Sequence, residues 1–486
     1  MFRFNTLLLI TVFYFNQTSF AGDADVVKLT SDFTRAEPYE ALPAGALTHK
    51  KGLNAEAFSH PSQNMSFERQ SDFHIGNAFF TRLWVSAPAS TKSSDGLGPL
   101  FNARACQRCH IKDGRGHPPE IDDQNAVSML VRLSVPPTSE KQLADLASGR
   151  IGSVDEPIYG GQLQDFSIAG VHSEGNIELS YTEVPIKLNG GEIVHLRQPT
   201  LKIVNLKYGG FHDKIMKSAR VAPQMIGLGL LESIAEQDIL AREDVNDKDA
   251  DGISGKANWV WSPEQQKRAL GRFGLKAGKA SLNEQNQAAF NGDIGLSTPL
   301  FPKASGDCTP KQVDCLEMPN GNIDGVEVSQ IVAEQILHYT RNLSVPARRN
   351  VSAANVLAGK RLFYQSGCTS CHTPKFITPR DTIAPEQSRQ LIWPYTDMLL
   401  HDMGEGLADN RPEFMADGHE WRTPPLWGIG LTPIVNGHSY YLHDGRARNL
   451  LEAVLWHGGE AESAKSKVVN MSDKEREQLI EFIQSL

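Results

Sequence analysis

Apolar residues recur at helical spacing in four parts of the chain. They predict helices over residues 73–84, 326–343, the run VLAGKRLFYQSGC that ends at residue 368, and the C-terminal run SDKEREQLIEFIQSL. In the last run Ser472 can cap the helix and acidic residues fill its first turn, which favours helix formation. The first two helices fall in the first part of the chain and the last two at its end, so the chain contains two helix pairs.

Strand-like alternation occupies the region between the first two helices. Apolar and polar residues alternate over 127–136 and 177–206, and Asn189, Gly190 and Gly191 separate two such runs as a turn. We therefore expect a β-hairpin there. The segment SVPARRN interrupts the helical pattern after residue 343, so we place the main domain boundary at 345–351. Residues 22–65 are polar and irregular and form a lead-in segment.

One five-residue frame occurs in both halves. Residues 106–110 read CQRCH and residues 368–372 read CTSCH, and C-x-x-C-H is the attachment signature of c-type haem. The candidate attachment residues are Cys106, Cys109, Cys368 and Cys371, with His110 and His372 as proximal iron ligands. A structural zinc site would need four Cys or His ligands, and a redox C-x-x-C would need a βαβ context. The sequence therefore predicts two covalently bound haem c groups.

The helix pairs place each motif in a recognisable setting. A helix before C-x-x-C-H and another at the end of the unit are the crossing pair expected of a cytochrome c fold. We therefore predict a mainly α protein with two cytochrome c-like domains. The N-terminal haem domain covers residues 22–345 and carries a large insertion with some β-structure, and the C-terminal domain covers residues 350–486.

Composition and the N-terminus bear on the compartment. The 486 residues are 40% hydrophobic and 22% charged, with a net charge of −9 that is not set in blocks, so we expect neither a nucleic acid nor a membrane surface as partner. Arg3, the apolar residues 7–15 and the sequence up to Ala21 predict a signal peptide over 1–21, a periplasmic location and no membrane anchor. In that oxidising compartment Cys308 and Cys315 are expected to form a disulfide.

A loop of alternating acids is a candidate calcium site. Asp247, Asp249 and Asp251 fit D-x-D-x-D-G, and the backbone carbonyl of Ile253 can add a ligand. Position twelve is Asn258 instead of the glutamate of an EF-hand, which favours a structural site over a sensor. An acidic, solvated turn without an ion is the alternative.

Seven stretches together resemble the di-haem oxidoreductase family of peroxidases. They are FNARACQRCHIKDGRG, APQMIGLGLLE, DKDADGISG, LGRFGLKA, LLHDMGEGLAD, EWRTPPLWGIG and YYLHDGRARNLLEAVLWHGGEA. That family is similar to the bacterial di-haem cytochrome c peroxidases and to the di-haem enzyme that matures methylamine dehydrogenase. The resemblance implies one haem with an open or openable face and one that relays electrons.

The resemblance also implies distal residues. In the relatives the sixth ligand of the C-terminal haem follows a Tyr-x-His-x-Gly segment, and the equivalent position here holds His457; Met403 is the competing ligand. For the N-terminal haem, the relatives place a Gln and a Glu ten residues apart, which matches Gln164 and Glu174 as catalytic residues for acid–base work on peroxide. Candidate sixth ligands for that haem are His172, His117 and His195.

Further residues belong to the C-terminal signature. We expect His443, Arg422 and Arg446 to shape the haem pocket or to pair with propionates. The relatives use an aromatic residue between the haems for electron transfer. Trp421, Trp427 and Tyr159 are the candidates here.

The combined prediction is a periplasmic di-haem c-type oxidoreductase of the peroxidase kind. Electrons would come from a small donor protein, a cytochrome or a cupredoxin, and pass from the C-terminal haem to the N-terminal active haem, with hydrogen peroxide or another small oxidant as substrate. The alternatives are a non-catalytic di-haem electron-transfer cytochrome and a di-haem oxidase that modifies a partner protein.

Overall fold

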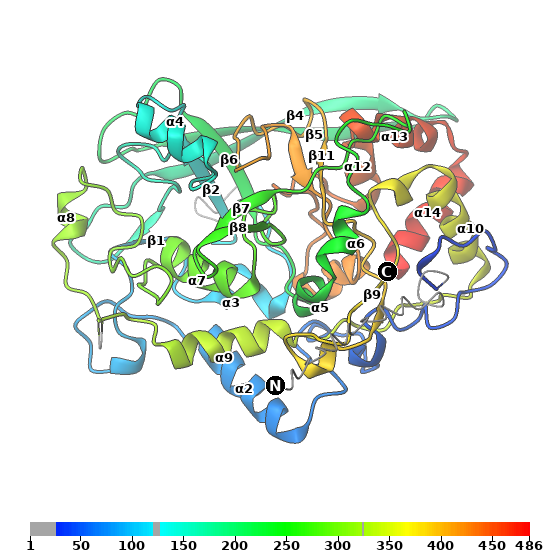
Figure 1. Cartoon of the computed structure of the whole chain (residues 1–486). Helices are drawn as coiled ribbons and strands as arrows, with labels where there is room; N and C mark the ends of the chain where they lie inside the picture. The colour runs from blue at the N-terminus through cyan, green and yellow to red at the C-terminus, as the bar shows by residue number, and fades with distance from the viewer. Residues whose placement is uncertain (1–25, 120–126, 323–324) are drawn as a thin grey trace, which may run out of the picture.

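The computed structural model describes residues 26–119, 127–322 and 325–486, so the predicted signal peptide lies outside the described residues. The helices are α2 (Phe67–Thr81), α3 (Cys106–Cys109), α4 (Glu140–Ala147), α5 (Leu228–Ser233), α6 (Glu236–Leu240), α7 (Leu282–Asp293), α8 (Val313–Leu316), α9 (Gln330–Arg341), α10 (Ala354–Gln365), α11 (Thr432–Asn436), α12 (Leu450–Leu455), α13 (Glu462–Asn470) and α14 (Asp473–Ser485). Figure 1 shows them distributed around a centre of short strands.

The strands pair two by two in antiparallel ribbons. These ribbons are β1 (Leu100–Phe101) with β3 (Phe166–Ser167), β2 (Met129–Ser134) with β6 (Met216–Val221), β4 (Asn176–Lys187) with β5 (Ile193–Val204), β7 (Trp259–Ser262) with β8 (Lys267–Leu270), β9 (Phe376–Ile377) with β10 (Leu391–Ile392), and β11 (Leu400–Asp402) with β12 (Glu420–Arg422). No larger sheet forms among the residues described.

The prediction of a mainly α fold is wrong. Of the described residues only 30% are helical and 17% lie in strands, so the chain is not plainly a pair of cytochrome c-like domains. The physical reason lies in the connections between helices. They are long and rich in turns, and they satisfy their backbone groups through two-stranded ribbons, with strands of two to twelve residues, instead of further helices.

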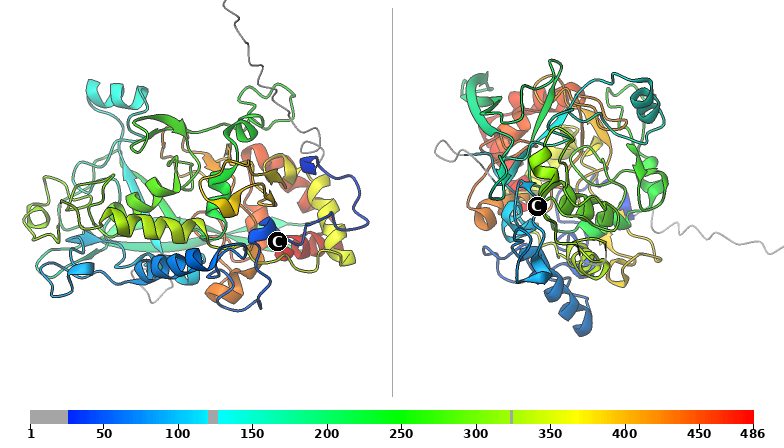
Figure 2. Two further views of the ribbon diagram at one scale, coloured as in Figure 1. Left: turned by 60° about the horizontal axis from the view of Figure 1, so that its bottom comes forward. Right: turned by 90° about the vertical axis from the view of Figure 1, so that its left-hand side faces the viewer.

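Both predicted helix pairs do form, and each crosses at a glycine. In the N-terminal half α2 packs on α9 (Figure 2, left), and Phe73 and Phe80 contact the ring of Tyr339. A Cβ on Gly76 would lie 2.3 Å from the carbonyl oxygen of Gln335. In the C-terminal half α10 packs on α14, and a Cβ on Gly359 would lie 1.9 Å from the carbonyl oxygen of Gln478. Only glycine permits these close backbone approaches.

The predicted hairpin is confirmed and reaches across the molecule. Strands β4 and β5 pair along their whole length, and the turn uses Gly190 and Gly191 at a φ of 92° each. The ribbon extends from β2 and β6 toward α13 and α14 along the top of Figure 1. Near its tip Leu188 and Leu196 are buried in the hydrophobic core that contains α10 and α14. The hairpin therefore packs into the C-terminal half.

The segment before α2 also packs against the C-terminal half. Glu40 is 1% exposed and accepts hydrogen bonds from Arg348 and, at 2.9 Å, from Lys360. Glu37 pairs with Lys360 at 2.8 Å and with Lys375 at 2.5 Å. Because buried charges must be paired, this cluster fixes the segment on α10.

The predicted disulfide is confirmed. Cys308 and Cys315 form the expected disulfide, with a Cα–Cα distance of 6.2 Å, and both are buried beside Leu100 and Val171. Over the described ranges, no helix has both the length and the apolar character required to cross a membrane.

Candidate functional site

A single cavity of about 990 Å³ contains both C-x-x-C-H motifs. Its wall includes Cys106, Cys109 and His110 from α3 and its C-terminal end, and Cys368, Cys371 and His372 from the segment after α10. None of the four cysteines is in a disulfide. Among the described residues, neither motif is part of a cluster of three or more metal-binding side chains. Both thiol pairs are therefore available to bind another group.

The two motif histidines are held in the same way. The Nδ1–H of His110 donates to the carbonyl of Pro223 at 2.7 Å, and that of His372 donates to the carbonyl of Tyr395 at 2.9 Å. A carbonyl can only accept, so Nδ1 carries the proton and Nε2 keeps its lone pair. Burial lowers the pKa of both rings, to about 4 for His372. Each imidazole is thus neutral and fits the role of an iron ligand.

His457, the predicted sixth ligand of the C-terminal haem, lines the same cavity. It follows α12, and its Nδ1–H donates to the carbonyl of Ala453 at 2.7 Å, which leaves Nε2 free. Burial lowers its pKa. His372 and His457 are close enough for His457 to contribute to the lowered pKa of His372. Met403 lines the cavity as well, so the alternative ligand is also present.

A buried histidine that the sequence did not single out lies beside Cys371. His401, on β11, has Nε2 at 2.8 Å from Asp397 and Nδ1 at 2.6 Å from Glu460, and its Nδ1 is 3.5 Å from the sulfur of Cys371. Burial would lower the pKa of His401, but the two carboxylates outweigh it and raise the pKa well above its usual value. A ring with both nitrogens protonated has no lone pair for iron.

Trp421 and His443 form a stack on the cavity wall. Their ring centres are 3.8 Å apart with an interplanar angle of 15°. Trp421 lies on β12 directly opposite His401 on β11, and its Nε1–H donates to the carbonyl of Leu407 at 2.9 Å. Of the other aromatic candidates, Trp427 and Tyr159 are buried in separate cores and are not part of this wall.

The two predicted arginines occupy different positions. Arg422 lines the cavity and donates from Nε to the carbonyl of Gly274 at 3.1 Å. Arg446 instead pairs with Asp444 at 2.8 Å and lies over the ring of Trp456, outside the cavity wall. Arg446 therefore holds the loop that carries His443 without facing the cavity.

Gln164 and Glu174 are close together but do not line the cavity. Both are buried, and the Glu174 carboxylate accepts from the backbone N–H of Gln164 and from the side-chain amide of Gln312, each at 2.5 Å. The Gln164 amide donates to the carbonyl of Gly292 at 2.9 Å. Burial raises the pKa of Glu174 well above its usual value. Their catalytic roles stay a prediction, and the contacts themselves support a structural role.

The other candidate ligands for the N-terminal haem lie elsewhere. His172 and His195 are exposed, and His117 is paired edge-on with His438 at 5.3 Å. None of these three is part of the cavity wall. Among the described residues, the imidazoles on the wall are His110, His372, His401, His443 and His457.

The three aspartates of the candidate calcium loop are brought together. Carboxylate oxygens of Asp247, Asp249 and Asp251 lie within 4.8 Å of one another. The carboxylate of Asp247 accepts the backbone N–H of Gly252 at 3.2 Å, which closes the turn. Asp251 and Ile253 also contribute to the edge of the large cavity.

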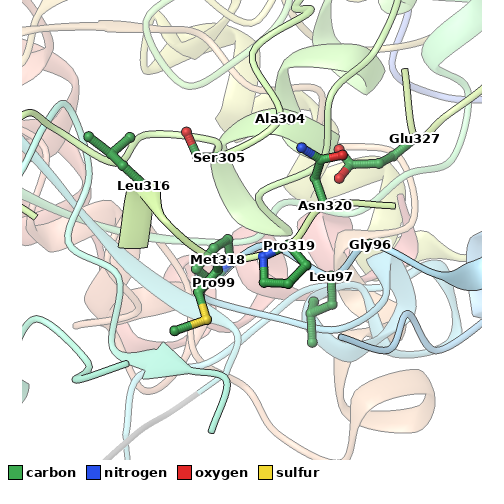
Figure 3. A pocket seen from close by; sticks show the side chains of 10 residues that line it. All are labelled: Gly96, Leu97, Pro99, Ala304, Ser305, Leu316, Met318, Pro319, Asn320 and Glu327. Carbon is green, nitrogen blue, oxygen red and sulfur yellow. The ribbon is translucent and has the colours of Figure 1, made fainter. Parts of the chain in front are cut away.

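A second, much smaller cavity lies near the disulfide loop. It has a volume of about 100 Å³ and is formed by Leu97, Met318, Asn320 and Glu327, among others (Figure 3). It contains none of the predicted site residues. The large cavity is therefore the candidate site.

Sequence reasoning missed the groups that come from distant parts of the chain. The carbonyl of Pro223 is 113 residues from His110, and no spacing rule connects the two. The same is true of Asp397 and Glu460 around His401. The only local signal was His401 itself, within LLHDMGEGLAD.

Comparison with known proteins agrees with this site. No curated protein matches the chain. The model of one protein family, described as "Di-haem oxidoreductase, putative peroxidase", matches residues 40–486. This match includes both motifs, the helix pairs and every residue of the cavity wall. The chain therefore belongs to the di-haem oxidoreductase family.

Proposed function

We propose that the protein is a periplasmic di-haem c-type oxidoreductase of the cytochrome c peroxidase kind, in which a small donor protein supplies electrons to the C-terminal haem and these reach the N-terminal haem. The observation that carries this proposal is the single cavity with a C-x-x-C-H motif in each half of its wall. When bound, haem supplies electron transfer and peroxide reduction. The surrounding residues bind it and set its environment.

The thiols and imidazoles support covalent attachment. Cys106 and Cys109 with His110, and Cys368 and Cys371 with His372, each offer two unpaired sulfurs and one neutral ring with a free Nε2. His457 would be a further ligand for the C-terminal haem iron through its free Nε2. Among the described residues of the cavity wall, no histidine besides these three bonds a backbone carbonyl through its ring, which supports a site at the N-terminal motif with room for a small substrate.

Trp421 is the aromatic residue best placed to relay electrons. It lies on the wall of the cavity that contains both motifs, and its stack with His443 and its bond to Leu407 fix the ring. A fixed, packed ring needs little rearrangement when charge moves past it. His443 and Arg446 are positioning residues in this proposal, because Arg446 holds Asp444 and Asp444 adjoins His443.

Calcium at Asp247, Asp249 and Asp251, with the carbonyl of Ile253, would fix the loop at the edge of the cavity. The next residue, Ser254, donates to Glu460 at 2.5 Å, and Glu460 holds His401 beside Cys371. A bound cation would thereby stabilise the surroundings of the C-terminal motif.

Two measurements test the proposed function. The denatured polypeptide should retain two haems per chain, since thioether bonds survive denaturation. Half-reduced protein mixed with hydrogen peroxide in a stopped-flow spectrometer should turn over, with a high-spin ferric signal from half of the haem beforehand. Two low-spin haems that stay low-spin on half-reduction would instead identify a non-catalytic carrier, and haem that leaves on denaturation would overturn the proposal.

Substitution of His457 tests the axial ligand. His457→Met should raise the reduction potential of the C-terminal haem and introduce the absorption band of a methionine-ligated iron, because imidazole donates more strongly than thioether sulfur. Met403→Leu is the matched control and should leave the spectrum unchanged. The opposite pattern, a change only in Met403→Leu, would assign Met403 as the ligand.

A further inference from the structure

Two cations on the cavity wall have no hydrogen-bonded or ion-paired partner among the described residues. Arg132, on β2, and Lys279 both line the wall. Among the described residues, neither side chain forms a hydrogen bond or an ion pair, and the Lys279 ammonium is 5.9 Å from the ring centre of Phe301. Removing a charge from water without a counter-charge costs free energy. These two side chains therefore have unused capacity to bind an anion.

The acids nearby are already engaged by other cations. The carboxylate of Glu413 binds Arg220 at 2.9 Å and Arg411 at 3.0 Å. Asp409 binds Lys276 at 2.7 Å. Asp155 also lines the cavity wall, but it forms no ion pair with Arg132 or Lys279. Arg132 is close enough to Asp155, Asp307 and Glu413 to act on their pKa values in the lowering direction. No carboxylate among the described residues is within ion-pair distance of Arg132 or Lys279, so the N–H donors of both side chains remain available to an anion.

Strand β2 connects Arg132 to the first motif. Cys109 contacts the carbonyl oxygen of Val127 through its sulfur at 2.8 Å, just before the strand begins. Leu130 and Arg132 then face the cavity, while Val131 is buried in a core. At about 3.3 Å per residue, the strand carries Arg132 roughly 10 Å along from Met129. The strand therefore places a cation well away from the thiols but on the same cavity wall.

We propose that Arg132 and Lys279 form a carboxylate-binding site on the cavity wall. The planar guanidinium of arginine matches a carboxylate with two parallel hydrogen bonds, and the lysine adds a point charge. Two sources could supply the carboxylate: the propionates of the haem attached to Cys106 and Cys109, or a small free carboxylate. The site rests on the proposed function, because it assumes haem at those cysteines.

The first arm of the test examines the propionates. Resonance Raman spectra of the full-length holoprotein are compared among wild type, Arg132→Gln, Lys279→Gln and Arg132→Lys. If the propionates occupy the site, the propionate bending band of the N-terminal haem shifts in both glutamine variants and returns toward wild type in Arg132→Lys. Lys267→Gln is the control, since Lys267 is exposed on β8 and forms no ion pair with any residue in the described ranges, and its band should not move.

The second arm examines a free carboxylate. Wild-type holoprotein is titrated with succinate by calorimetry. Saturable binding that weakens about tenfold or more in Arg132→Gln and Lys279→Gln, but not in Lys267→Gln, identifies a free ligand as the source. Unchanged Raman bands together with no succinate binding would overturn the site. If the proposed function fails instead, haem is released on denaturation, which is a separate and visible outcome.

Discussion

At the scale of single residues, the partner of Nδ1 decides what four of the five cavity histidines can do. His110, His372 and His457 donate from Nδ1 to a backbone carbonyl and keep Nε2 free. His401 meets carboxylates at both nitrogens and is held as a cation. The same side chain is thus a candidate ligand in three places and a fixed charge in the fourth.

The contacts of Glu174, a predicted catalytic acid, favour a structural role. Its carboxylate accepts from the backbone of Gln164 and from the amide of Gln312. We expect Glu174→Gln to lower the free energy of unfolding by about 1–3 kcal/mol. The NH₂ group of the new glutamine would face one of the two N–H donors, on Gln164 or Gln312, that the carboxylate now accepts. Urea unfolding measures this loss. Peroxide turnover per folded molecule should stay near wild type.

A matched variant separates stability from catalysis at this position. Gln312→Ala removes one partner of Glu174 without touching the carboxylate, and it should show a similar loss of stability and the same turnover. If Glu174→Gln abolished turnover while its unfolding curve matched that of wild type, the catalytic role predicted for Glu174 would be restored.

His49 makes the stability of the protein depend on pH. It is fully buried, its Nε2–H donates to the carbonyl of Ala57 at 2.7 Å, and burial lowers its pKa from 6.5 to about 4. The folded state thus favours the neutral ring. Above pH 6.5 the ring is neutral in both the folded and the unfolded state. As the pH falls from 6.5 toward 4, only the unfolded state takes up a proton, so the free energy of unfolding falls by at most roughly 3 kcal/mol.

Unfolding at two pH values tests this dependence. Wild type should lose more stability than His49→Gln between pH 7 and pH 4.5, because glutamine keeps a donor but does not titrate. The control is His74→Gln, a histidine on the exposed face of α2. Equal pH dependence in wild type and His49→Gln would contradict the assignment.

At the scale of elements, the two helix crossings depend on glycine. Gly359→Ala places a methyl group against the backbone of α14, so we expect a loss of about 1–3 kcal/mol in the free energy of unfolding. Gly292→Ala in α7 is the matched control. Nothing lies within 4 Å of a Cβ there, and that variant should gain up to about 1 kcal/mol from helix propensity. Equal effects in the two variants would show that the crossing tolerates a Cβ.

Elements were predictable from the sequence where their signal is local and long. The helices before and after Cys368 and the Asn189-Gly190-Gly191 turn need only neighbouring residues to be identified. Strands such as β11 and β12, with three residues each, are too short for alternation to register. The predicted fold class was wrong because two-stranded ribbons, many of them short, and not further helices, form the connections between the predicted helices.

The site residues, too, were predictable only where their signal is local. The C-x-x-C-H frames are contiguous, so their role could be predicted directly. His457 followed from a resemblance. Other residues reach the cavity wall only when distant segments of the chain pack together, as Pro223, Arg132 and Lys279 do. A single sequence contains no pattern that connects these residues.

At the scale of the whole molecule, the two halves share their cores. The hairpin tip of β4 and β5 is buried among residues of α10 and α14, and Glu40 from the segment before α2 is paired with Lys360 of α10. A cavity wall made by both halves adds to this interdependence. We therefore expect the chain to unfold as one cooperative unit, although it contains two similar motifs.

Leu196→Ala tests whether the halves unfold together. Leu196 is 2% exposed and packs in the core of the C-terminal half, although its strand belongs to the N-terminal half. Truncation should cost about 2–5 kcal/mol, and urea unfolding followed through the absorption of each haem should shift to the same lower midpoint. Leu143→Ala on α4 is the control, since Leu143 is 55% exposed and its loss should change stability by less than about 0.5 kcal/mol. If the midpoint followed at the C-terminal haem fell in Leu196→Ala while the midpoint at the N-terminal haem stayed unchanged, the two halves would be independent folding units. The shared cores would then hold the halves together without coupling their unfolding.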